Sequence, residues 1–144
     1  MKVKYGIDPL NRSPSTPSSY REKFLGEIYD ALSGKGFMVE RYEDSSGKGL
    51  RGHLDVYPLV MVNVYLHHST SEVEACVFFE GDTELNLVTA ASPEIKDKTR
   101  QRRFHFPVNV ERLAIELTHD ALIMGATLET IHLRQAADER LSKE

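Results

Sequence analysis

The chain has 144 residues, of which 40% are hydrophobic and 28% charged, and its formal net charge is −4. These values are typical of one globular domain with a core of ordinary size. No apolar run approaches the ~20 residues of a membrane span, and the N-terminus lacks the apolar centre of a secretory signal. The single cysteine, Cys76, excludes an intramolecular disulfide and a zinc site built from cysteines. We therefore expect a cytoplasmic protein without membrane contact.

The N-terminal segment is expected to be a flexible arm over residues 1–18, with a single α+β domain over 19–144. Residues 11–19 read NRSPSTPSS, and this density of serine and proline is typical of a loop. Residues 2–7 can form a short edge strand or share the disorder of the arm. The arm therefore contributes little to the predicted core.

A helix is predicted over residues 19–33. Ser19 and Glu22 have the spacing of a capping box, and Gly34 and Gly36 supply the end of the helix. Apolar residues recur on one face at helical spacing. They are Tyr20, Phe24, Ile28, Ala31 and Leu32.

The next segment is predicted to be extended. Residues 37–43 form a strand, residues 44–52 a flexible turn, and residues 54–68 a long extended region. Pro58 marks a break or an edge position, because proline cannot donate a hydrogen bond to a sheet. Beyond Pro58 the side chains alternate between a fully apolar face and a mixed one. The apolar set is Val60, Val62, Val64 and Leu66, and the mixed set is Met61, Asn63, Tyr65 and His67.

Two further strands are predicted after a turn at residues 69–72. Residues 73–80 alternate between apolar and mixed positions, and residues 84–89, ELNLVT, follow a Gly-Asp turn as a shorter strand. Since short turns join the three successive strands, we expect an antiparallel meander.

A long C-terminal helix is predicted over residues 109–135. Asn109 is a suitable N-cap, and Glu111 lies where the helix dipole favours an acid. Apolar residues recur every three or four positions and continue past Gly125, so the helix is either straight or kinked at that glycine. Residues 92–103, which precede it, can form a short helix or an ordered loop.

This order of elements predicts an α+β fold. An N-terminal helix, a mostly antiparallel sheet of about four to five strands, and a long C-terminal helix packed on one face satisfy the layer rules for such domains. The last helix has more apolar length than one small sheet can cover. Residues 110–131 are compatible with a heptad repeat, so they can join two copies in a homo-oligomer or simply face the core.

Two patterns in the sequence resemble parts of metal-dependent sites. Glu116 with His119 and Glu129 with His132 repeat a Glu-x-x-His pattern, but a spacing of thirteen residues places the motifs about 20 Å apart on one helix, so no metal site is predicted. Separately, residues 31–56 resemble the start of restriction-endonuclease-like nucleases, with Asp55 as the first acid. The second acid and lysine of that pattern are replaced by an asparagine and a tyrosine in the next strand.

Two other motifs are incomplete. His67, His68, Ser69 and Thr70 contain one His-x-Thr sequence, whereas two-histidine phosphoesterases need a second to supply both acid and base. Residues 45–52, SSGKGLRG, can cradle a phosphate with backbone N–H groups, but their spacing is not that of a P-loop, and a hairpin turn explains the glycines equally well. Neither motif predicts an enzyme.

The densest positive charge lies in residues 96–103, which hold five of the 18 basic residues and one acid. Arginine predominates there, and its guanidinium fork suits phosphate groups. The candidate anion-binding residues are Lys96, Lys98, Arg100, Arg102, Arg103, Lys48 and Arg51. Phe104 and Phe106 can stack on bases or anchor the segment to the core.

The leading hypothesis is therefore a non-enzymatic binding protein that holds an anionic partner, either nucleic acid or a phosphorylated small molecule such as a nucleotide. No cofactor is expected. The first alternative is a protein–protein adaptor or inhibitor that uses the long helix and the sheet. The second alternative is a degenerate restriction-endonuclease-like nuclease.

Overall fold

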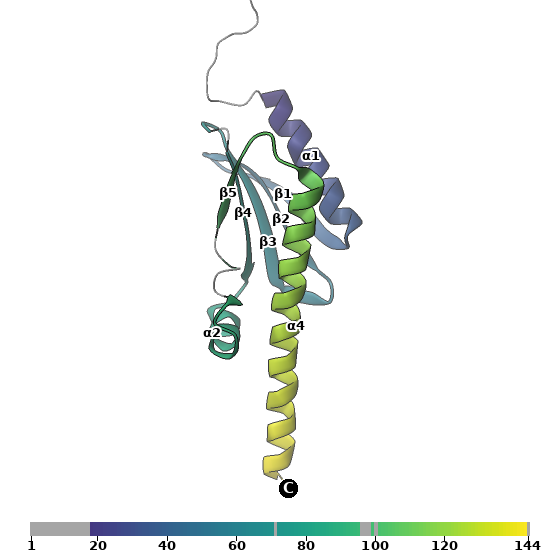
Figure 1. Cartoon of the computed structure of the whole chain (residues 1–144), viewed down its shortest axis with the longest axis vertical. Helices are drawn as coiled ribbons and strands as arrows, with labels where there is room; N and C mark the ends of the chain where they lie inside the picture. Colours follow the sequence, from purple (N-terminus) through teal and green to yellow (C-terminus); the bar gives the residue numbers. More distant parts are fainter. Residues whose placement is uncertain (1–17, 71, 96–98, 100, 144) are drawn as a thin grey trace, which may run out of the picture.

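The structure is a computed structural model that describes residues 18–70, 72–95, 99 and 101–143 (Figure 1). The expected arm and the optional strand at 2–7 lie outside these residues, apart from Ser18. The elements in chain order are α1 (Ser18–Gly34), β1 (Phe37–Glu43), β2 (Gly47–Leu54), β3 (Tyr57–His67), β4 (Glu72–Phe79), α2 (Asp82–Ala91), β5 (Arg102–His105) and α4 (Val110–Lys143). The expected α+β fold class is thereby confirmed.

The strands form one five-stranded sheet in the order β1-β2-β3-β4-β5, and all neighbours are antiparallel. Helices α1 and α4 cover one face of this sheet, which we call the helix face, and α2 lies near the end of β4 (Figure 1). The opposite face, here called the open face, is covered by none of the described helices. The domain thus has two layers, as the order of elements predicted.

The core lies between the helix face and the two long helices. Val60, Val62 and Val64 of β3 are fully buried there, and the alternation predicted for β3 and β4 is confirmed. Pro58 lies beside the register shift between β2 and β3, so the predicted break is also present.

The expected flexible turn at residues 44–52 is wrong, because β2 begins at Gly47. A Cβ atom added at Gly47 would lie 2.7 Å from the Tyr65 ring, and one at Gly49 would lie 2.6 Å from the Tyr42 ring. The glycines therefore admit large rings lying on the strand, and flexibility is not their role. The turn itself is short, and Asp44 Oδ1 accepts hydrogen bonds from the backbone N–H groups of Ser46 and Gly47.

The strand expected at residues 84–89 is also wrong, because this segment belongs to helix α2. Asp82 and Glu84 lie in the first turn, where the helix dipole favours acids. Val88 is buried and Leu85 packs against the core, which is the i, i+3 spacing of a helix. The six-residue pattern is too short to distinguish the two-residue period of a strand from the 3.6-residue period of a helix.

The C-terminal helix is confirmed and is longer than expected, because it continues to Lys143 without a break at Gly125. Its N-cap is confirmed, since Asn109 Oδ1 accepts a hydrogen bond from the Arg112 N–H at 3.0 Å. No described helix is apolar enough over sufficient length to cross a membrane.

Candidate functional site

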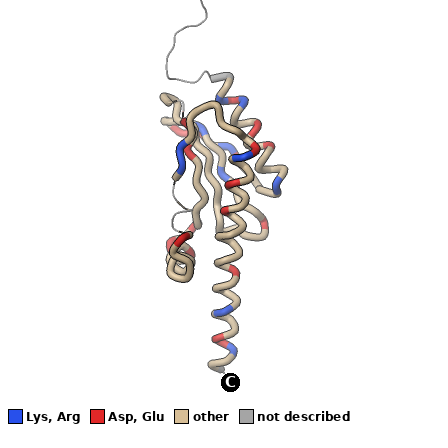
Figure 2. Tube along the Cα trace, in the orientation of Figure 1, with Lys and Arg blue, Asp and Glu red and all other residues tan. Residues whose placement is uncertain are grey.

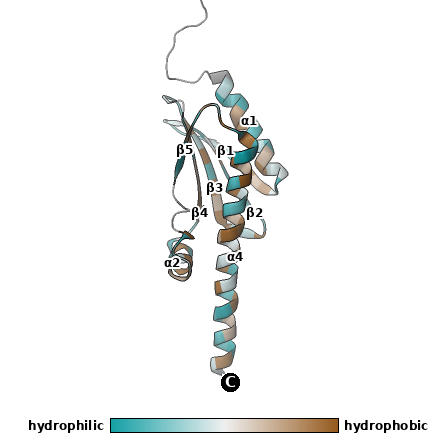
Figure 3. Ribbon diagram, viewed as in Figure 1, coloured by the Kyte–Doolittle hydropathy of each residue, from teal (hydrophilic) through white to brown (hydrophobic). Residues whose placement is uncertain are grey.

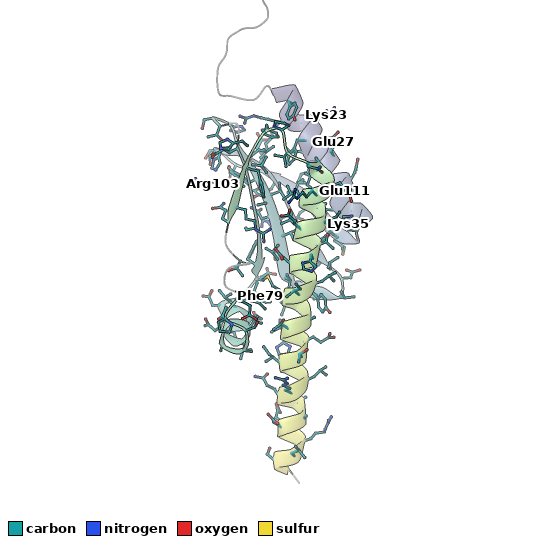
Figure 4. All side chains as sticks on the ribbon, in the orientation of Figure 1. Lys23, Glu27, Lys35, Phe79, Arg103 and Glu111 are labelled. Carbon is teal, nitrogen blue, oxygen red and sulfur yellow. The ribbon has the colours of Figure 1, made fainter. Side chains whose placement is uncertain are left out.

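The described basic residues of the basic segment 96–103, Arg102 and Arg103, lie in the edge strand β5 (Figure 2). Consecutive side chains of a strand point to opposite faces. Arg102 is therefore on the helix face and Arg103 on the open face, and Figure 4 shows Arg103 projecting from β5 away from α4. Three predicted anion-binding residues, Lys96, Lys98 and Arg100, lie outside the described residues.

Arg102 joins β5 to helix α4. Its guanidinium donates a hydrogen bond to Asp120, whose side chain is 9% exposed, and lies 3.7 Å from a Glu116 oxygen. An ion pair with a buried carboxylate is costly to break, because the remaining charge lacks both water and a partner. Arg102 therefore acts as a structural link between β5 and α4.

Arg103 has its own buried partner on the other face. Its Nε lies 3.3 Å from Glu74, whose remaining oxygen accepts a hydrogen bond from Gln101 at 2.8 Å and lies 3.1 Å from His67 Nε2. Glu74 is only 8% exposed, so these groups surround a carboxylate that has little water. The two arginines of β5 thus hold the edge strand from both faces.

Two further candidates lie on β2, again on opposite faces. Lys48 Nζ is 2.5 Å from Glu22 of α1, and this contact raises the pKa of the Lys48 amine and lowers the pKa of the Glu22 carboxyl. Arg51 lies over the Tyr42 ring, 4.7 Å from its centroid. Among the described candidates, Arg51 is the one without a carboxylate partner in the described residues.

The two predicted stacking residues lie against the body of the protein. Phe104 is opposite Val73 on the helix face, and Phe106 makes edge-to-face contacts with Tyr20 and Phe24, with centroid distances of 5.0 and 5.3 Å. Both rings are half-buried. These contacts support the role of both rings as anchors to the core, and base stacking stays a prediction.

The open face carries a feature that the sequence analysis missed, namely two tyrosines lying on glycines. The Tyr42 and Tyr65 rings are nearly parallel, with centroids 6.1 Å apart, and they lie over Gly49 and Gly47 of the intervening strand. Tyr65 donates a hydrogen bond to Asp44, which lowers the pKa of the Asp44 carboxyl. The alternating Gly-x-Gly of β2 was the available signal.

Next to the tyrosines, a row of large side chains crosses four strands. Strand register places Met38, His53, Met61 and Phe78 directly opposite one another on the open face. Met38 is 56% exposed, and Met61 and Phe78 are half-buried. We call these four residues the methionine row.

A shallow groove of about 460 Å³ is lined by three residues of the methionine row, Met38, His53 and Met61. Its polar wall includes Arg51 and Glu40, which are opposite each other in the next row of the sheet, and Glu80 also lines it. The groove therefore combines an apolar floor with charges of both signs, a composition common at protein interfaces.

The other predicted motifs are not assembled into sites. Asp55 is exposed in the β2–β3 turn, while Asn63 accepts a hydrogen bond from the Tyr42 hydroxyl at 2.6 Å. Within the described residues, no group of three His, Cys, Asp or Glu side chains is arranged to hold a metal ion. Cys76 is half-buried on the open face, and burial, aided by Glu74, raises the pKa of its thiol.

Comparison with known proteins gives no relative. No family model, no curated protein and no solved structure matches this chain. The function must therefore be inferred from the surfaces of the molecule.

Proposed function

We propose that this protein is a non-enzymatic protein-binding module that holds an apolar segment of a partner protein on the open face of its sheet. The observation that carries this proposal is the methionine row, which presents large side chains on a face that none of the described helices covers. Removing such side chains from water contributes roughly 25 cal/mol per Å² of apolar area, which offsets the loss of freedom on association.

The chemistry of the groove suggests what the partner segment contains. Methionine is unbranched and polarizable, so Met38 and Met61 can adapt to apolar side chains of different shape. Arg51 offers an exposed guanidinium beside them, which favours a partner carboxylate. We therefore expect a segment with two or more large apolar residues and an acid close by.

The ion pairs of β2 and β5 are the reason for preferring a protein partner to an anion. Arg102, Arg103 and Lys48 all have carboxylate partners within the chain, so binding a phosphate there would have to displace an acid. Anion binding remains a second candidate, supported by the exposed Arg51.

Selection from a random peptide library by the full chain tests the proposal. We expect enriched peptides to carry large apolar residues with a nearby acid, and Met61→Glu to weaken their binding at least about tenfold. Leu141→Glu is the matched control, because Leu141 is 68% exposed on α4 and should tolerate the charge. Peptides that bind the Met61→Glu chain as well as wild type would refute the proposed surface.

The second candidate is tested in parallel with nucleotides and short oligonucleotides. If it is correct, these ligands raise the melting temperature of the wild type and bind less at higher salt. Arg51→Ala should then weaken binding while the domain stays folded, because Arg51 is exposed and has no carboxylate partner in the described residues. Thermal stabilisation by oligonucleotides, together with no enriched peptide, would favour anion binding.

A further inference from the structure

Helix α4 carries a second row of apolar residues on the side opposite its buried positions, and the last of them, Leu133, also lines a pocket with residues 56–60 of the β2–β3 turn and β3. Ile115, Leu122 and Leu133 are 52%, 44% and 66% exposed, and Ala126 is also exposed. These residues follow one another at spacings of seven, four and seven. At about 100° per residue they fall within about 40° of one another around the helix axis. We call these four residues the outer stripe.

The outer stripe is distinct from the buried side of the helix. Leu117, Met124 and Leu128 contact the core and point about 180° away from it, by the same helical geometry. Figure 3 shows hydrophobic and hydrophilic stretches alternating along the whole of α4. An ordinary core-facing helix has one apolar side, so the outer stripe calls for a second partner.

The C-terminal end of α4 lacks support within the described chain. After Ile131 none of its described residues is buried, and Figure 1 shows this end extending alone past the rest of the molecule. The residues from 132 to 143 would form a helix at the lower end of the ~12–15 residues that an isolated helix needs to be stable in water. Packing against another body would stabilise it.

We propose that two copies of the chain associate through α4 in antiparallel orientation, with the outer stripe as the interface. The spacing of seven, four and seven reads the same in both directions, as an interface with twofold symmetry requires. Ile115 and Leu133 are each nine residues from Met124, and Leu122 and Ala126 are each two residues from it. An antiparallel pair centred at Met124 therefore places Ile115 against Leu133 of the other copy, and Leu122 against Ala126.

Charge also favours the antiparallel arrangement. His119 and Glu129 lie among the stripe residues, and each is five residues from Met124, so the antiparallel pair brings His119 of one copy to Glu129 of the other. A parallel pair would bring Glu129 against Glu129, and like charges in contact are unfavourable. The antiparallel pair also lays the protruding end of each helix along the N-terminal half of the other.

The test is the mass of the full chain in solution, measured by light scattering after size exclusion. We expect about twice the chain mass of 16.3 kDa for wild type, and the single-chain mass for Leu122→Glu at the same concentration. Met38→Glu is the matched control, since it places the same charge on the open face and should leave the dimer intact. A wild type that remains a single chain at all concentrations would overturn the proposal.

Orientation is tested by crosslinking in a Cys76→Ser background. A chain carrying both Ile115→Cys and Leu133→Cys should form crosslinked dimers with a short bis-maleimide, and a chain carrying Leu133→Cys alone should not. Crosslinking of the single-cysteine chain would show a parallel pair and refute the proposed register.

These outcomes are independent of the peptide-binding proposal. Leu122→Glu should lose the dimer and retain peptide binding, whereas Met38→Glu should retain the dimer and lose peptide binding. Either proposal can therefore be refuted while the other holds.

Discussion

Replacing Gly125 with alanine should destabilise the protein, although the same change at Gly26 should stabilise it. Both glycines lie inside long helices, where alanine is favoured by about 1 kcal/mol. They differ in their surroundings. A Cβ atom at Gly26 would have one neighbour, an Arg41 side-chain nitrogen at 3.7 Å, whereas a Cβ atom at Gly125 would lie 2.2 Å from Cγ of Tyr57.

The magnitude at Gly125 follows from this distance. Ordinary contacts of this kind begin at 3.4 Å, so the ring and the helix would have to separate by at least the difference, 1.2 Å. Overpacking of this kind costs about 1–3 kcal/mol, and we take about 3 because three ring atoms lie within 3 Å of the new carbon. After the gain in helix propensity, Gly125→Ala should lose about 2 kcal/mol and lower Tm by about 4–8 °C.

Thermal unfolding followed by circular dichroism measures both variants. We expect Gly26→Ala to raise Tm by about 2–4 °C, because it gains propensity and meets no obstacle. In a Tyr57→Ala background the cost of Gly125→Ala should disappear. If Gly125→Ala stabilises the protein as Gly26→Ala does, or if its cost persists without the tyrosine ring, the reasoning is wrong.

Three further predictions concern the charged and titratable groups. Arg102→Ala should cost about 3 kcal/mol in urea unfolding, because it removes an ion pair with the buried Asp120. Arg103→Ala should cost less, because Gln101 and His67 still contact its partner Glu74, and equal losses would contradict this. The pKa of Asp44 lies below its ordinary value of 3.8, so its contribution to stability is complete above that pH and is lost as the pH falls through the lowered pKa. The difference in unfolding free energy between wild type and Asp44→Ala should therefore shrink on acidification; a constant difference would contradict this. Because the pKa of Cys76 is raised, its thiol should react with iodoacetamide more slowly than a small-molecule thiol at pH 8; equal rates would count against its burial.

The sequence by itself determined the elements whose signal is local and long. Alternation in β3, helical spacing in α1 and α4, and the Asn109 cap depend on residues at most a few positions apart, so one segment carries the whole pattern. Segment 84–89 is too short for its sequence pattern to separate a helix from a strand. Its helical period is visible only in the fold, where Leu85 and Val88 both pack against the core.

Only the tertiary structure decided the role of β2 and of the charged residues. Gly47 pairs with β3, and Gly49 pairs with both β1 and β3. Glycine is required at both positions because a side chain would meet the Leu66 carbonyl oxygen and the Tyr65 ring at Gly47, and the Tyr42 ring at Gly49. Sequence composition could not show which residues would meet across the sheet.

In the basic segment, too, the sequence could not show which charged residues would meet. Its arginines looked available for an outside anion, yet Arg102 meets Asp120, which is 18 residues away in sequence, and Arg103 meets Glu74 in the neighbouring strand. The number of charges is a property of the sequence. Which charges are neutralised depends on strand register and helix packing, because ion pairs form between side chains that folding brings within a few ångströms.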